Sequence, residues 1–126
     1  MKNISELSEH QEQCLVVLWC ELNSSTDRRL SLIYAIPNGT WARNIGAARK
    51  AKAEGAKKGV PDLFLPVAAN GCYGLYVEMK KTVGGSISVD QKHWLQQLEE
   101  QGYQCEVCKG SVAAISVIKR YLGLNM

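Results

Sequence analysis

Three residues near the middle of the chain have types and spacing suited to phosphate chemistry. Asp62 follows a proline, and Glu78 and Lys80 are separated by one residue in the apolar run LYVEMK. In a β-strand, alternate side chains point to the same face, so Glu78 and Lys80 should lie together and an aspartate on a neighbouring strand could join them. Two carboxylates brought close repel and raise each other's pKa, and a cation between them removes that cost. The trio is therefore either a metal site or an ordinary exposed Glu78–Lys80 ion pair.

The chemistry of a metal at this position follows from its donor atoms. Carboxylate oxygens, together with the backbone carbonyl of Met79, are ligands for Mg²⁺ or Mn²⁺ rather than zinc. Such an ion lowers the pKa of a bound water and stabilises negative charge on a phosphate. Lys80 would orient the attacking water or stabilise the pentavalent phosphorus. Pro61 fits the start of a strand, and Gly59 permits a close backbone approach, which favours the metal site over the ion pair.

The elements that must position this trio follow from hydrophobic periodicity and turn residues. Residues 5–22 favour a helix, since Leu15, Leu18, Trp19 and Leu22 recur at helical spacing, and Ser5 or Ser8 can cap it. The expected elements are, in order, helix 5–22, strand 30–36, helix 42–54, strands 62–67 and 75–81 as an antiparallel pair, helix 88–101, strand 103–108 and helix 112–122. This αβαββαβα order predicts an α/β fold with a central mixed sheet flanked by helices.

Composition limits the class of protein. The chain has 126 residues, 46% of them hydrophobic and 21% charged, which is the size and composition of one globular domain, here residues 1–126. No apolar run approaches the about 18 residues that a membrane span needs. The polar start MKNISELSEHQEQ lacks a signal-peptide core, so we expect a cytoplasmic protein with no membrane partner.

The five cysteines suggest a possible zinc site, but the spacing is unfavourable. Cys105 and Cys108 form the only close pair, and no second pair stands at zinc-finger spacing. His10 and Cys14 are four apart on the expected first helix, which is weak as a ligand set. We expect reduced, free thiols in a cytoplasmic chain.

Basic residues are concentrated in one segment although the formal net charge is only +3. Between positions 43 and 58, six basic residues face a single acid, Glu54. The six are Arg43, Arg49, Lys50, Lys52, Lys57 and Lys58. This segment is either a solvated helix face or a patch that contacts DNA phosphates.

Taken together, these motifs resemble a known nuclease family. Pro61-Asp62 followed by Glu78-Met79-Lys80 looks like the PD-(D/E)xK signature. The longer run resembles the VRR-NUC (virus-type replication-repair nuclease) branch of that superfamily, in the standalone form of phage and bacterial members. The matching segments are SEHQEQ at 8–13, IPNG at 36–39, KAEGAKKGVPDLFLPV at 52–67, GLYVEMKK at 74–81 and GGSISVDQKHWLQQLEEQGY at 84–103. Methionine at 79 departs from the more usual aliphatic residue, but only its carbonyl should matter.

The resemblance implies a restriction-endonuclease-like fold and a role for each matching position. Asp62, Glu78 and the Met79 carbonyl would bind the metal, and Lys80 would act on the nucleophilic water. A glutamate of the first helix would complete the site, and Glu9 fits better than Glu12 because it follows Ser8 and precedes Gln13.

Further positions carry more than one interpretation. Gln91 would lie near the active site, although Ser88-x-x-Gln91 also fits a helix capping box and both roles can hold at once. Asn38 would line the substrate groove or form a simple turn, and Trp41 would stack on a base or pack locally. The expected DNA-contacting residues are Asn38, Arg43, Lys50, Lys52, Lys57, Lys58 and Lys81.

The resulting functional hypothesis is a Mg²⁺- or Mn²⁺-dependent endonuclease for branched DNA. Two symmetric cuts in a Holliday junction would require a homodimer, so a resolvase-like dimer is preferred and flap cleavage is the near alternative. A non-catalytic DNA-binding subunit with the same fold is a rival, but it would usually have lost one of Asp62, Glu78 and Lys80. A sequence-specific restriction enzyme is disfavoured because no recognition insertion is visible.

Overall fold

The computed structural model describes residues 6–37 and 44–126. Four strands form one sheet in the order β1-β2-β3-β4. The strands are β1 (Tyr34–Ala35), β2 (Leu63–Leu65), β3 (Leu75–Lys80) and β4 (Gln104–Lys109). β2 is antiparallel to both β1 and β3, whereas β3 and β4 are parallel, so the sheet is mixed as the sequence predicts.

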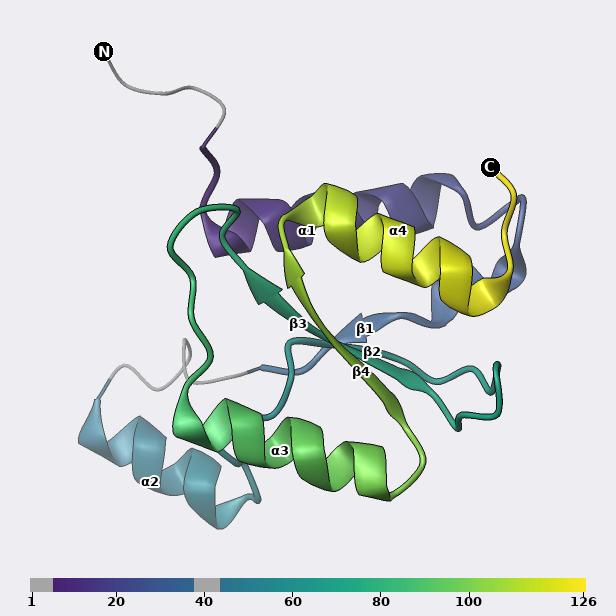
Figure 1. Ribbon diagram of the computed structural model, residues 1–126. Helices are drawn as coiled ribbons and strands as arrows, with labels where there is room; N and C mark the ends of the chain where they lie inside the picture. The colour runs from purple at the N-terminus through teal and green to yellow at the C-terminus, as the bar shows by residue number, and fades with distance from the viewer. Residues whose placement is uncertain (1–5, 38–43) are drawn as a thin grey trace.

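The helices form layers on the two faces of this sheet (Figure 1). They are α1 (Glu9–Leu22), α2 (Ile45–Ala53), α3 (Val89–Glu100) and α4 (Ser111–Leu122). α1 and α4 pack side by side on one face, and α3 crosses the other face on its way from β3 to β4. The expected αβαββαβα order is confirmed. Within the described residues, no helix is long and apolar enough to cross a membrane.

The leucines that mark residues 5–22 as a helix do not form the buried face of α1. The helix begins after Ser8, whose hydroxyl accepts from the Gln11 amide, but Leu15, Leu18 and Leu22 are 41%, 48% and 70% exposed. The buried stripe is instead Glu12, Val16 and Cys20. These residues are spaced four apart, so they share one face of the helix. Because Glu12 is polar, hydrophobic periodicity alone does not identify this face as the buried one.

The expected strand at 30–36 is mostly a 3-10 helix, η1 (Arg28–Leu32), with only two residues of β1 after it. Asp27 caps η1 by accepting from the Arg29 amide, and its carboxylate also binds the Arg29 guanidinium at 2.6 Å. These local hydrogen bonds offer the backbone an alternative to a sheet ladder, which β-propensity alone does not reveal. Leu30 still reaches the core and is fully buried.

The main core lies between the sheet and the α1–α4 layer. Leu75, Val77 and Met79 of β3 point into it, and all three are at most 1% exposed. The opposite face of β3, which carries Tyr76, Glu78 and Lys80, faces the α3 side. Because both faces of β3 are covered, its polar side chains are held in a buried setting.

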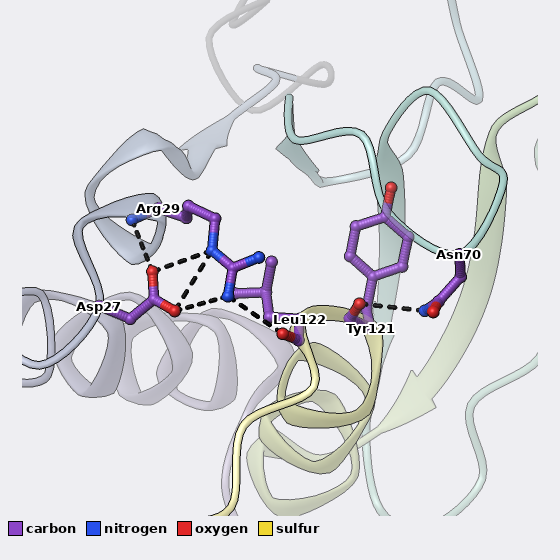
Figure 2. A network of polar contacts seen from close by, with 5 residues as sticks. All are labelled: Asp27, Arg29, Asn70, Tyr121 and Leu122. Atoms are coloured by element: carbon purple, nitrogen blue, oxygen red, sulfur yellow. Dashed lines mark hydrogen bonds and ion pairs between the residues drawn. The ribbon is translucent and has the colours of Figure 1, made fainter.

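The C-terminal end of α4 is held by side chains from elsewhere in the chain (Figure 2). Arg29 donates to the carbonyl of Leu122 at 3.0 Å, and the Asn70 amide donates to the carbonyl of Tyr121 at 3.0 Å. The last carbonyls of a helix have no partner within the helix, so these contacts satisfy them. Gly123, at φ +70°, ends the helix.

Candidate active site

Glu78 and Lys80 lie at the end of β3 and are both buried, with residual exposures of 2% and 7%. The Lys80 Nζ atom is 3.7 Å from Glu78 Oε2. The ion pair therefore exists, but it is not the exposed pair that the alternative interpretation required. Burying two charges costs several kcal/mol unless further hydrogen bonds compensate, so this pair depends on the polar groups around it.

Asp62 immediately precedes β2 and lies across from Glu78. Its backbone is fixed where β2 begins between β1 and β3. The Asp62 carbonyl accepts from the Ile36 amide at 2.8 Å, and the next residue, Leu63, pairs with Val77 of β3. Its Oδ2 accepts from the Met79 amide at 2.7 Å, which aims the carboxylate at the residue beside Glu78. The structure thus brings Asp62, Glu78 and the Met79 backbone together, as the sequence predicts.

The Glu78 carboxyl group has a strongly perturbed pKa. Burial, the charge of Asp62 and a hydrogen bond shared with that residue raise its pKa to about 8, while Lys80 opposes the shift. When Asp62 and Glu78 are both ionised, neither carboxylate can donate a hydrogen bond to the other. In that state Glu78 Oε1 has no hydrogen-bond partner, and it is the one such buried side-chain nitrogen or oxygen of the described residues. A buried acceptor without a donor is costly, and it points to a missing positive partner.

Gln91 connects α3 to both charged residues of β3. Its Oε1 accepts from Lys80 Nζ at 3.0 Å, and its Nε2 donates to Glu78 Oε2 at 3.0 Å. The same side chain accepts from the Ser88 amide at 2.9 Å, while Ser88 Oγ accepts from the Gln91 amide, which completes a capping box. Gln91 therefore caps α3 and at the same time contacts both Lys80 and Glu78, and its functional role stays a prediction.

The loop before Asp62 packs directly on the start of α3. Gly59 has φ +94°, and a Cβ atom there would lie 2.6 Å from the backbone carbon of Asp90. Only glycine accepts both the conformation and the contact. The close approach that the sequence suggested for Gly59 thus sets where Pro61 and Asp62 enter the sheet.

The two candidate acids of α1 have different surroundings. Glu9 is exposed at the start of the helix, and its charge contributes to the raised pKa of Glu78. Glu12, in contrast, is buried and only 4% exposed. Its Oε1 accepts from the backbone amide of Ser111 at 3.1 Å, at the first turn of α4. Sequence reasoning missed this contact, although the four-residue spacing to Val16 and Cys20 could have placed Glu12 on the buried face.

The candidate DNA-contacting lysines of the described segments are all at the surface. Lys50 and Lys52 are exposed on α2, Lys57 and Lys58 on the loop after it, and Lys81 just after β3. Lys58 Nζ also lies 3.8 Å from the Asp90 carboxylate. The candidate DNA contacts Asn38 and Arg43, and Trp41, lie outside the described residues.

The cysteines of the described segments do not gather around a metal. Cys105 and Cys108 lie three apart on β4, so they point to opposite faces of the sheet. Burial raises the pKa of Cys105 to about 12 and that of Cys108 to about 11, which keeps both as thiols. Among residues 6–37 and 44–126, no group of three or more His, Cys, Asp or Glu side chains is arranged to hold a metal ion.

Comparison with known proteins places the chain in a family. The sequence profile of the VRR-NUC domain matches residues 2–112. A solved structure described as a VRR_NUC domain protein is 30% identical to this chain, with a TM-score of 0.81, and the alignment covers 96% of this chain and 93% of that one. No curated protein matches significantly. The pairing of Asp62 with Glu78 and Lys80 at the sheet end, the mixed α/β fold and the near full-length profile match agree, and the chain belongs to the VRR-NUC family of nucleases.

Proposed function

We propose that this protein is a Mg²⁺- or Mn²⁺-dependent endonuclease that hydrolyses phosphodiester bonds in branched DNA. Family membership supplies the nuclease activity and DNA as the substrate. The observation that carries the metal dependence is the buried Glu78 Oε1, which has no donor within the described residues and lies beside a second carboxylate. Hard divalent cations prefer such oxygen donors.

The residues present fit a divalent ion in number and type. Asp62 and Glu78 would hold it by their carboxylates and Met79 by its carbonyl, and water would complete the shell, as Mg²⁺ commonly retains several waters. The ion would supply a water of lowered pKa and charge stabilisation at the phosphate. The Met79 amide already fixes the Asp62 carboxylate, so one ligand is oriented before the ion arrives.

Gln91 and Lys80 would place a fixed positive charge beside the carboxylates of Asp62 and Glu78. Gln91 Oε1 holds the Lys80 ammonium, and Gln91 Nε2 holds Glu78 Oε2, so neither long side chain is free to rotate. Lys80 thereby presents a fixed positive charge and three N–H donors next to the two carboxylates. A pre-oriented cation of this kind stabilises the negative charge that develops on a phosphate during attack. Glu9, exposed at the start of α1, is close enough for its charge to act on Glu78 and would be the acid that the first helix contributes.

We further propose that the enzyme acts as a homodimer on four-way junctions. A junction is resolved by two symmetric cuts, and a C2 dimer presents two identical active sites. Flap cleavage is the second candidate. It requires a single cut and therefore only one active site, so oligomeric state and substrate preference separate the two.

The decisive experiment compares labelled four-way, flap, fork and linear DNA in Mg²⁺, Mn²⁺ or EDTA. We expect cleavage of branched substrates in either ion and none in EDTA, and loss of cleavage with retained DNA binding in Asp62→Ala and Lys80→Ala. Cleavage that survives EDTA or both substitutions would overturn the metal mechanism. A monomer in sedimentation that cuts single flaps as fast as junctions would exclude the resolvase.

A further inference from the structure

The clearest unexplained feature near the active site is the buried carboxylate of Glu12. It is one of three buried charged residues in the described part of the chain, and the other two are Glu78 and Lys80 of the site itself. A buried carboxylate is stable only when hydrogen-bonded or paired. Glu12 meets this requirement through the Ser111 amide, 99 residues further along the chain.

The partner of Glu12 is the start of a helix that has no cap of its own. The residue before α4 is Gly110, at φ +91°, and no side chain of that position caps the helix. The first amides of a helix lack partners within the helix, and its N-terminus favours negative charge. Glu12 of α1 therefore serves as the N-terminal cap of α4 from a different helix. A Cβ atom at Gly110 would lie 3.2 Å from Glu12 Oε2 and 2.6 Å from Thr82, so glycine is what lets these segments meet.

The residue before α4 is also hydrogen-bonded to the end of β3, the strand that carries Glu78 and Lys80. The Gly110 amide donates to the carbonyl of Lys80 at 2.9 Å. A continuous path thus runs from the Glu12 carboxylate through Ser111 and Gly110 to the backbone of Lys80. Figure 1 shows why this junction matters: α1 and α4 both begin near the end of β3.

We propose that Glu12 is a positioning residue of the nuclease, which fixes the start of α1, and with it Glu9, against the end of β3. Glu9 lies one turn before Glu12 on the same helix, so the anchor and the acid move together. The far end of α4 is held by Arg29 and Asn70, so both ends of α4 are tied to other segments and its first turn gives Glu12 a fixed partner. Glu12 acts through its hydrogen bond and does not contact the reacting atoms. This inference rests on the proposed catalytic use of Glu78 and Lys80 and on the proposed contribution of Glu9.

The first test separates a hydrogen-bonding role from a charge-bearing one. Glu12→Gln retains an oxygen that can accept from the Ser111 amide, whereas Glu12→Ala does not. We expect Glu12→Gln to keep kcat within about threefold of the wild type, and Glu12→Ala to lose about tenfold or more of kcat with little change in KM for DNA, since small misplacements of catalytic groups have effects of this order. Glu21→Ala, an exposed acid of the same helix, is the matched control and should match the wild type.

The second test does not depend on activity. Amide hydrogen exchange at Ser111 should accelerate about tenfold or more in Glu12→Ala, as expected for the removal of a buried partner, while the amides of α3 keep their protection. Ser111→Pro removes the donor at a helix position that tolerates proline. If the hydrogen bond is the link, the double variant Glu12→Ala/Ser111→Pro should lose no more kcat than the more affected single variant.

The outcomes distinguish this inference from the proposed function. If the wild type cleaves DNA and folded Glu12→Ala cleaves equally well, or if Glu12→Gln is as inactive as Glu12→Ala, the positioning role is wrong. The latter result would make Glu12 a charge-bearing member of the site. If the wild type does not cleave DNA but Ser111 exchange still responds to Glu12→Ala, the proposed function has failed while the structural link stands.

Discussion

The Gln91 side chain donates to Glu78 Oε2 at 3.0 Å while its own carbonyl oxygen accepts from Lys80 at the same distance. One neutral amide therefore contacts both members of a buried pair whose charged atoms are 3.7 Å apart, and it leaves Glu78 Oε1 without a donor. Because the amide also belongs to the α3 capping box, the side chains of Glu78 and Lys80 on β3 are held by the first turn of the helix that follows that strand. This coupling gives the site several properties that can be measured.

The raised pKa of Glu78 predicts a pH-dependent stability in the absence of divalent ions. The folded protein keeps the Glu78 proton up to about pH 8, whereas the unfolded chain releases it near 4.5. Between these values the folded state binds more protons, so this group lowers the free energy of unfolding as pH rises and its contribution levels off above about pH 8. In EDTA, Tm of Glu78→Gln should therefore increasingly exceed that of the wild type across this interval. Exposed Glu100→Gln should track the wild type, and a pH-independent difference for Glu78→Gln would contradict the assignment.

Replacement of Lys80 tests its proposed role in catalysis rather than in binding. Lys80→Met removes the buried ammonium and should lower kcat by about 100-fold or more, a loss typical of removing one stabilising group from an active site. The Kd for DNA should change little, because the side chain is only 7% exposed. Lys109→Met is the matched control, since Lys109 pairs with Lys80 on the neighbouring strand but is exposed. Equal losses in the two variants would argue against a specific role for Lys80.

The two functions of Gln91 can be separated by variants of its capping partner. Ser88→Ala and Gln91→Ala should each reduce the free energy of unfolding by about 0.5–2 kcal/mol, since each removes half of the capping box. Only Gln91→Ala also frees Lys80 and Glu78, so only this variant should lose most of kcat. Thermal denaturation and single-turnover cleavage measure the two effects. Similar activity in both variants would mean that Gln91 is a helix cap alone.

The exposed lysines of α2 predict a salt-dependent contribution to DNA binding. If Lys50 and Lys52 each bind a phosphate, the double Gln variant should reduce the slope of log K against log[salt] by about 0.9 for each phosphate that is no longer neutralised. Arg120→Gln changes an exposed residue of α4, and α4 lies on the other side of the sheet from α2 (Figure 1), so this variant should leave the slope unchanged. An unchanged slope in the α2 variant would show that its basic face is simply solvated.

The sequence by itself determined which residues are candidates for chemistry and the order of the main helices and strands. Asp62, Glu78 and Lys80 are recognisable because strand alternation and a short hairpin bring such residues together whatever the details of packing. The capping residues Ser8 and Ser88 and the stop at Gly102 are local signals, and the structure contains each of them.

The tertiary structure decided which side chains are buried and which distant residues form hydrogen bonds. The leucines of α1 look like core residues, but Glu12, Val16 and Cys20 face inward, where Glu12 accepts from the first amide of α4. Residues 28–32 became a 3-10 helix because Asp27 and Arg29 form local hydrogen bonds that compete with strand pairing. The raised pKa of Glu78 likewise arises from burial beneath α3 and beside Asp62. The local sequence pattern predicts helices, strands and caps. Burial and long-range hydrogen bonds exist only after distant segments have packed together.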